Sequence, residues 1–152
     1  AQKIDLIGQA VDLAKAQGVP SGVGAHELGV VLECEKNKIN ADFYIKTFHH
    51  HSYPSAPKPD QIKGPYNEYP GYWCSDPAAT AAFMKQVNKP WIAFKILAAG
   101  AIRPESAIKY AFQNGADFIC VGMFDFQVEQ NVALVRSTLP QVDSSRERAW
   151  MA

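Results

Sequence analysis

Four short runs of apolar or β-branched residues alternate along the chain with segments of helical periodicity. The runs lie near residues 19–25, 41–48, 91–97 and 116–123, and the third, WIAFKIL, is almost continuously apolar. Such runs are typical of parallel strands that are buried on both faces. Strands that alternate with helices predict a parallel sheet joined by right-handed crossovers. The pattern therefore predicts an α/β fold with four parallel strands.

About five segments carry the helical pattern. The first, at 3–17, places its apolar residues on one stripe. The others are expected at 27–36, from Pro77 to about 88, from Pro104 to 113, and at about 125–139, where Pro140 should end the last helix. The final dozen residues are polar until Trp150, and we expect them to fray or to dock on a partner.

One segment lacks any strand or helix period. Residues 49–75 contain five prolines, two glycines and four tyrosines. Long irregular segments inside compact domains are usually lids or binding loops, although a disordered excursion is the alternative. The aromatic content favours an ordered Pro/Tyr-rich loop after the second strand. We expect residues 1–152 to form a single domain around it.

The charge balance excludes some partner classes. The chain has 15 basic and 15 acidic side chains, so a generic nucleic-acid surface or a polybasic membrane patch is not expected. No run of 18 apolar residues occurs, and no membrane segment is expected. Cys34, Cys74 and Cys120 are odd in number and far apart, which favours a reduced, cytoplasmic setting.

Two turns that follow predicted strands carry the best chemical signal. LAAGAIRP (97–104) and CVGMF (120–124) each place small residues after a buried strand and before a helix. Small residues let backbone N–H groups face a ligand, and a following helix N-terminus adds unpaired donors. The candidate phosphate-binding residues are Gly100, Ala101, Gly122 and Met123. The alternative interpretation is that both segments are merely tight turns.

The segment AAGAIRPESAIKYAFQNGADFICVGM (98–123) resembles strands seven and eight of a phosphate-binding (β/α)8 barrel. In that superfamily these two strand ends form the phosphate site. Many members have two glycines in the first turn, where this chain has Gly100-Ala101. The sequences of residues 89–102 and 115–128 also resemble an uncharacterised bacterial family of TIM-barrel proteins. This resemblance implies the fold but no reaction.

If the last two strands are strands seven and eight, the chain is the C-terminal half of a (β/α)8 barrel. A full barrel needs about 250 residues, and 152 residues fit four units. A half-barrel exposes two strand edges and an apolar inner face. We therefore expect a homodimer that closes an eight-stranded barrel, with a mostly hydrophobic interface on the order of 2,000 Å². The alternative is a non-catalytic barrel fragment that retains an anion site.

Three residues are candidates for catalysis: His26, Lys46 and Lys95. Barrel active sites lie at the carboxyl ends of the strands, and a lysine in a buried strand has a lowered pKa that makes it nucleophilic. The phrase IKT (45–47) is similar to strand six of class I sugar-phosphate aldolases. This resemblance implies a phosphorylated substrate, a lyase reaction and an imine on Lys46. The alternative is that both lysines are structural.

The triplet His49-His50-His51 suggests a second type of site. Alternate residues of an extended segment share a face, so His49 and His51 could converge with His26, and with Cys74 or Glu68, on Zn²⁺ or Mn²⁺. This hypothesis describes a metal-dependent sugar-phosphate isomerase or epimerase. No confident cofactor follows from the sequence, because the motifs of hydrolase triads, nucleotide cofactors and zincins do not occur.

Overall fold

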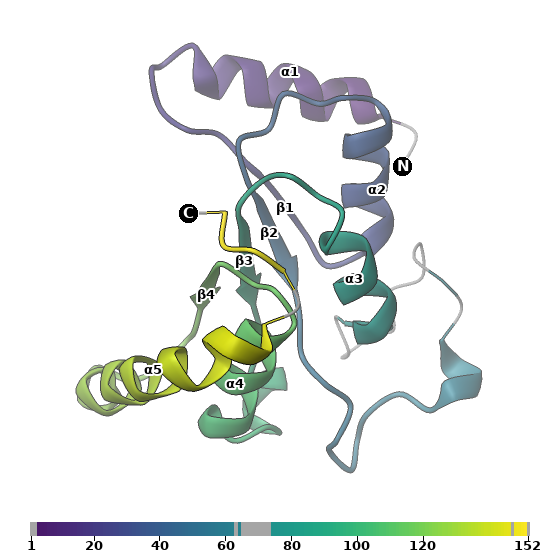
Figure 1. Ribbon diagram of the computed structural model, residues 1–152. Coiled ribbons are helices and arrows are strands. Elements are labelled where there is room, and N and C mark those ends of the chain that lie inside the picture. The colour runs from purple at the N-terminus through teal and green to yellow at the C-terminus, as the bar shows by residue number, and fades with distance from the viewer. Residues whose placement is uncertain (1–2, 63, 65–73, 147, 152) are drawn as a thin grey trace.

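The computed structural model describes residues 3–62, 64, 74–146 and 148–151 (Figure 1). Its sheet contains four strands in the order β1-β2-β3-β4. They are β1 (Val23–Ala25), β2 (Tyr44–Thr47), β3 (Trp91–Phe94) and β4 (Phe118–Cys120). All neighbouring pairs are parallel. The predicted α/β class and four-stranded parallel sheet are confirmed, and the arrangement is consistent with a half-barrel.

Five α-helices lie within the described residues. They are α1 (Ile4–Lys15), α2 (Leu28–Lys36), α3 (Pro77–Met84), α4 (Pro104–Gln113) and α5 (Val128–Val142). Helix α3 begins at Pro77, as predicted, and Asp76 caps it: its side chain accepts a hydrogen bond of 2.8 Å from the Ala79 amide. Pro77 and Pro104 occupy first-turn positions, where a missing N–H costs nothing.

The third strand is shorter than the sequence pattern predicts. It ends at Phe94, because Lys95 has a left-handed backbone with φ of 54°. Ala98, Ala99 and Gly100 also have positive φ values, which produces a tight turn toward α4. Lys95 therefore lies just beyond the strand and not within it, which corrects the expectation of a lysine inside an apolar strand.

The last helix lies about three residues further along the chain than expected, at Val128–Val142 in place of about 125–139. Pro140 lies inside α5 and does not end it, since the helix continues to Val142. Proline removes one helical hydrogen bond, but the extra turn fully buries the Val142 side chain. The burial of this side chain compensates for the lost hydrogen bond, and the local sequence pattern does not show it.

The residues after α5 dock on their own chain. Asp117, next to β4, has a fully buried carboxylate that pairs with the guanidinium groups of Arg146 and Arg148. The same carboxylate accepts hydrogen bonds of 2.9 Å from the amides of Trp91 and Met151. The expectation of a frayed or partner-docked tail is therefore wrong for residues 148–151. The reason is a buried charge that needs cationic partners.

The two faces of the sheet have different surroundings. Tyr44 lies on the face that the helices cover, because its hydroxyl donates a hydrogen bond of 2.7 Å to Glu35 of α2. The strand register places Thr47, Phe94 and Cys120 on the other face, where Cys120 is exposed. We call these the helix-covered face and the open face. The open face corresponds to the inner face of the expected half-barrel.

Candidate functional site

A cavity of about 250 Å³ lies at the carboxyl ends of β3 and β4, and we call it the strand-end cleft. The first turns of α4 and α5 contribute to its walls. It is lined by Leu97, Pro104, Glu105, Gly122, Met123, Gln127, Gln130, Asn131 and Leu134. Two of the four predicted phosphate-binding residues, Gly122 and Met123, therefore border a cavity.

The local structure leaves room for a ligand beside Gly122. A Cβ atom built on this residue meets no atom within 4 Å, so open space adjoins its backbone. Helix α4 begins at Pro104, and its N-cap residue, Arg103, makes no side-chain capping bond. Amides in the first turn of a helix lack helical partners and carry partial positive charge. Glu105 also lines the cleft, and its negative charge opposes an anion electrostatically.

The other two predicted residues have a different environment. The Gly100 amide donates to the Leu97 carbonyl at 2.9 Å, and the Ala101 amide donates to the Ala98 carbonyl at 3.2 Å. Both amides are therefore hydrogen-bonded within the turn in this conformation, and neither residue lines the strand-end cleft. The reason is the left-handed backbone at Ala98 and Ala99, which tightens the turn.

Lys46 lies far from solvent. Its residue is 1% exposed, and its ammonium donates a hydrogen bond of 2.7 Å to the Thr47 carbonyl. Since strand residues two apart share a face, Lys46 lies with Tyr44 on the helix-covered face. The structure thus buries Lys46 under the helix-covered face and does not expose it at the strand ends, where barrel active sites lie.

Buried polar groups surround Lys46. The positive charge of Lys46 lowers the pKa of Cys74, whereas burial, the larger effect, raises it. His49 is 1% exposed, and its ring stacks on Tyr53 at 5.9 Å. Burial first, and then the charges of His51, His50 and Lys46, lower the pKa of His49 to about 3. Within the described residues, neither ring nitrogen of His49 has a hydrogen-bond partner.

His26 lies on the other side of the sheet. Its Nδ1 atom is 2.7 Å from the Thr47 hydroxyl, and its ring stacks on Phe94 at 5.3 Å. Thr47 and Phe94 belong to the open face, whereas Lys46 lies on the helix-covered face. The structure therefore does not bring His26 and Lys46 into one site.

The metal hypothesis receives no support from the geometry. Residues 3–62, 64, 74–146 and 148–151 contain no group of three or more His, Cys, Asp or Glu side chains that could hold a metal ion. His51 instead contacts the Cys74 carbonyl through Nε2 at 2.6 Å. Glu68, a possible further ligand, lies outside the described residues.

One contact near the cleft was missed by the sequence analysis. The Nε2 atom of His50 is 2.9 Å from the Ser106 hydroxyl in the first turn of α4. The Nδ1 atom of His50 accepts a hydrogen bond of 3.1 Å from the Ser52 amide, so Nε2 carries the proton and donates to Ser106. This tautomer cannot take a proton from Ser106. His50 and Ser106 therefore attach the loop to α4 and do not act as a base and its nucleophile. The two residues are 56 positions apart, so no local motif indicates this contact.

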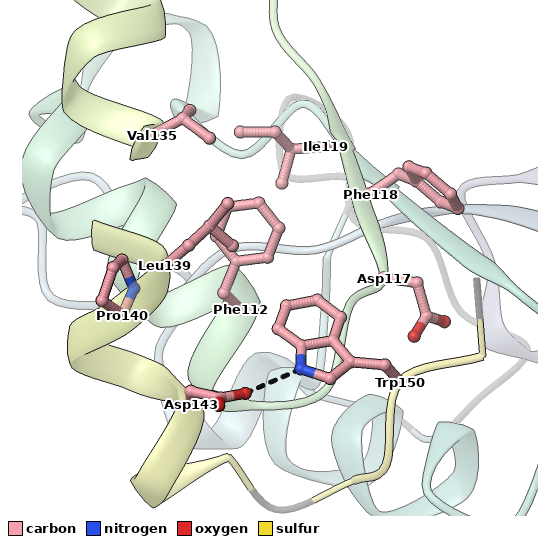
Figure 2. A pocket seen from close by; sticks show the side chains of 9 residues that line it. All are labelled: Phe112, Asp117, Phe118, Ile119, Val135, Leu139, Pro140, Asp143 and Trp150. Carbon is pink, nitrogen blue, oxygen red and sulfur yellow. Dashed lines mark hydrogen bonds between the residues drawn. The ribbon is translucent and has the colours of Figure 1, made fainter. Parts of the chain in front are cut away.

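A larger cavity, of about 660 Å³, lies between α5 and β4 (Figure 2). Figure 2 shows Ile119 pointing toward Val135 of α5, whereas Phe118 points away from that helix. A second cavity of about 540 Å³ shares Ile119 and Val135 with the first. We call the two together the α5 groove. Its apolar lining includes Phe112, Phe118, Ile119, Val132, Val135, Leu139 and Pro140.

No family model, curated protein or solved structure matches this chain. Among the described residues, no helix combines the length and apolar character that a bilayer crossing requires.

Proposed function

We propose that this chain binds a small phosphorylated molecule in the strand-end cleft. The observation that carries the proposal is the position of Gly122 and Met123, which line a cavity between the first turns of α4 and α5. Ligands of parallel α/β folds bind at the carboxyl ends of the strands, and barrel phosphate sites use this pair of strand ends. The cleft lies at that edge of the sheet.

Backbone groups are the expected phosphate donors. The amides of Gly122 and Met123 and those in the first turn of α4 would bond the phosphate oxygens, helped by the positive end of the helix dipole. Gly100 and Ala101 take no part, because their amides are bonded within the turn. A volume of about 250 Å³ is too small for a nucleotide and suits a compact phosphate ester.

The proposal stops at binding. Imine chemistry on Lys46 would require the helix-covered face to open, since this residue is buried. The metal-dependent isomerase would require His26 and His49 to share a site, and the contacts of His26 lie on the open face. Neither reaction is favoured by the arrangement of these side chains.

Calorimetric titration with glycerol 3-phosphate and with inorganic phosphate tests the binding proposal, with glycerol as the ligand control. Gly122→Val would place its Cβ in the open space beside the backbone, so it should weaken phosphate binding about tenfold or more while the fold is retained. The matched control is Gly24→Ala in β1, where an added Cβ makes ordinary contacts at 3.8 Å. Equal phosphate affinity in the Gly122 variant and the native protein would refute the site.

We also propose that a second copy of the chain completes the sheet. Strands β1 and β4 are the ends of the described sheet, and Phe118 of β4 is 46% exposed on the open face. Exposed edges and apolar faces favour association. In a two-fold dimer, β4 of each copy would pair with β1 of the other and produce eight parallel strands. Sedimentation equilibrium at micromolar concentrations tests this, and a monomer would contradict it.

A further inference from the structure

The α5 groove is an apolar surface, and no helix of the described residues covers it. Helix α5 packs on α4, and the cavities of about 660 and 540 Å³ separate it from β4. The other strands of the sheet have a helix over each seam, because α2, α3 and α4 each connect two neighbouring strands. The groove therefore lies where one more helix would pack if the sheet continued beyond β4.

Helix α1 presents the complementary surface. One stripe packs on the core through Val11, which is buried. A second stripe contains Leu6 and Leu13, which are 48% and 71% exposed. These two leucines are seven residues apart and so lie on the same face of the helix. Figure 1 shows α1 and α5 at opposite ends of the molecule, so α1 cannot fill the groove of its own copy.

The topology predicts where α1 would lie in a closed sheet. A helix that precedes a strand in a right-handed crossover covers the seam between that strand and the preceding one. Helix α1 precedes β1, and the described sheet has no strand on the far side of β1. In the proposed dimer, β4 of the second copy takes that place. Helix α1 would then cover the new seam, next to α5 of the second copy.

The charges and spacings of the two helices match. In this arrangement α1 and α5 would run in the same direction, because α1 leads into the amino end of a strand and α5 follows the carboxyl end of one. Asp12 is the ninth residue of α1, and Arg136, which borders the groove, is the ninth of α5. Both are exposed. Val132 and Leu139 in the groove have the same seven-residue spacing as Leu6 and Leu13.

We propose that α1 of one copy packs its Leu6–Leu13 stripe into the α5 groove of a second copy, with Asp12 of the first facing Arg136 of the second. This interface rests on the proposed dimer and specifies how its helical layer closes. The apolar stripe contributes affinity, and the charge pair at the rim sets the register of the two helices. A two-fold axis repeats the contact, so each dimer contains two of them.

Charge exchange at the rim tests the interface, with the dimer dissociation constant measured by sedimentation equilibrium. Asp12→Arg and Arg136→Asp should each weaken the dimer about tenfold, because each places like charges face to face. The double variant, Asp12→Arg with Arg136→Asp, should restore the affinity to within roughly threefold of the native value. Leu13→Glu should weaken the dimer about a hundredfold, since it buries a carboxylate in an apolar groove.

The control is Val19→Ser, an exposed apolar residue outside α1, which should leave the dissociation constant unchanged. All of these side chains are exposed, so circular dichroism should show native helix content in each variant. If the native protein is a dimer and none of the four variants in α1 and α5 weakens it, this interface is wrong while the proposed dimer stands. A native monomer would overturn both.

Discussion

The ammonium of Lys46 donates its hydrogen bond to the carbonyl of the next residue, Thr47, at 2.7 Å. The two side chains nevertheless leave β2 on opposite faces, since neighbouring strand residues alternate. Thr47 contacts His26 on the open face, whereas Lys46 lies among buried groups on the helix-covered face. The sheet thus separates His26 from Lys46, two of the three candidate catalytic residues.

Lys46 should resist amine-directed labelling in the native protein. Reductive methylation should modify Lys36, whose side chain is 75% exposed, and leave Lys46 unmodified until the chain unfolds. Borohydride reduction with glyceraldehyde 3-phosphate should likewise give no adduct at Lys46. Peptide mapping by mass spectrometry measures both reactions. Rapid native modification of Lys46 would reopen the aldolase hypothesis.

Acid should destabilise the fold through His49. Its pKa is lowered from the usual 6.5 to about 3, so the unfolded chain takes up a proton first as the pH falls. The contribution to stability is fully present above pH 6.5 and is lost progressively between pH 6.5 and 3, by about 2 kcal/mol at about pH 5. Urea unfolding across this pH range measures the effect.

His49→Leu should flatten that part of the stability profile, because leucine binds no proton. The matched control is His50→Gln. Burial also lowers the pKa of His50, but this residue is more accessible than His49. A profile for the His49 variant that is as steep as the native one would show that another group causes the acid sensitivity.

The Asp117 cluster should contribute strongly to stability. Arg148→Met leaves the buried carboxylate with one guanidinium in place of two, and it also removes donors to the carbonyls of Val87 and Lys89. Breaking a buried ion pair in this way costs about 3–5 kcal/mol. Chemical denaturation measures the loss. Lys36→Met, at an exposed ion pair with Glu33, should leave the unfolding midpoint unchanged.

Glu105 should weaken phosphate binding in the strand-end cleft. Its carboxylate lines the cavity and repels an anion, so Glu105→Gln should tighten the binding of glycerol 3-phosphate several-fold. The gain should shrink at high salt, because screening already reduces the repulsion. Calorimetry measures both trends. Glu33→Gln on α2 is the control for a general change in net charge. Weaker phosphate binding in the Glu105 variant would place the anion elsewhere.

The sequence by itself determined the order of the strands and helices. The alternation of apolar runs with helical segments predicted a four-stranded parallel sheet, and the prolines at Pro77 and Pro104 predicted where two helices begin. These features depend on residues within one turn or one strand of each other. A reader of the sequence can evaluate such interactions directly, since caps, proline positions and periodicity are local.

Only the tertiary structure decided which groups meet. Alternation places Lys46 and Tyr44 on one face, but the packing of α2 decides that this face is covered. The tail is ordered because Arg148 reaches Asp117, 31 residues earlier. Residues far apart in the chain create these environments. Burial, the pKa of a group and access to it are properties of the packed chain, and no local pattern specifies them.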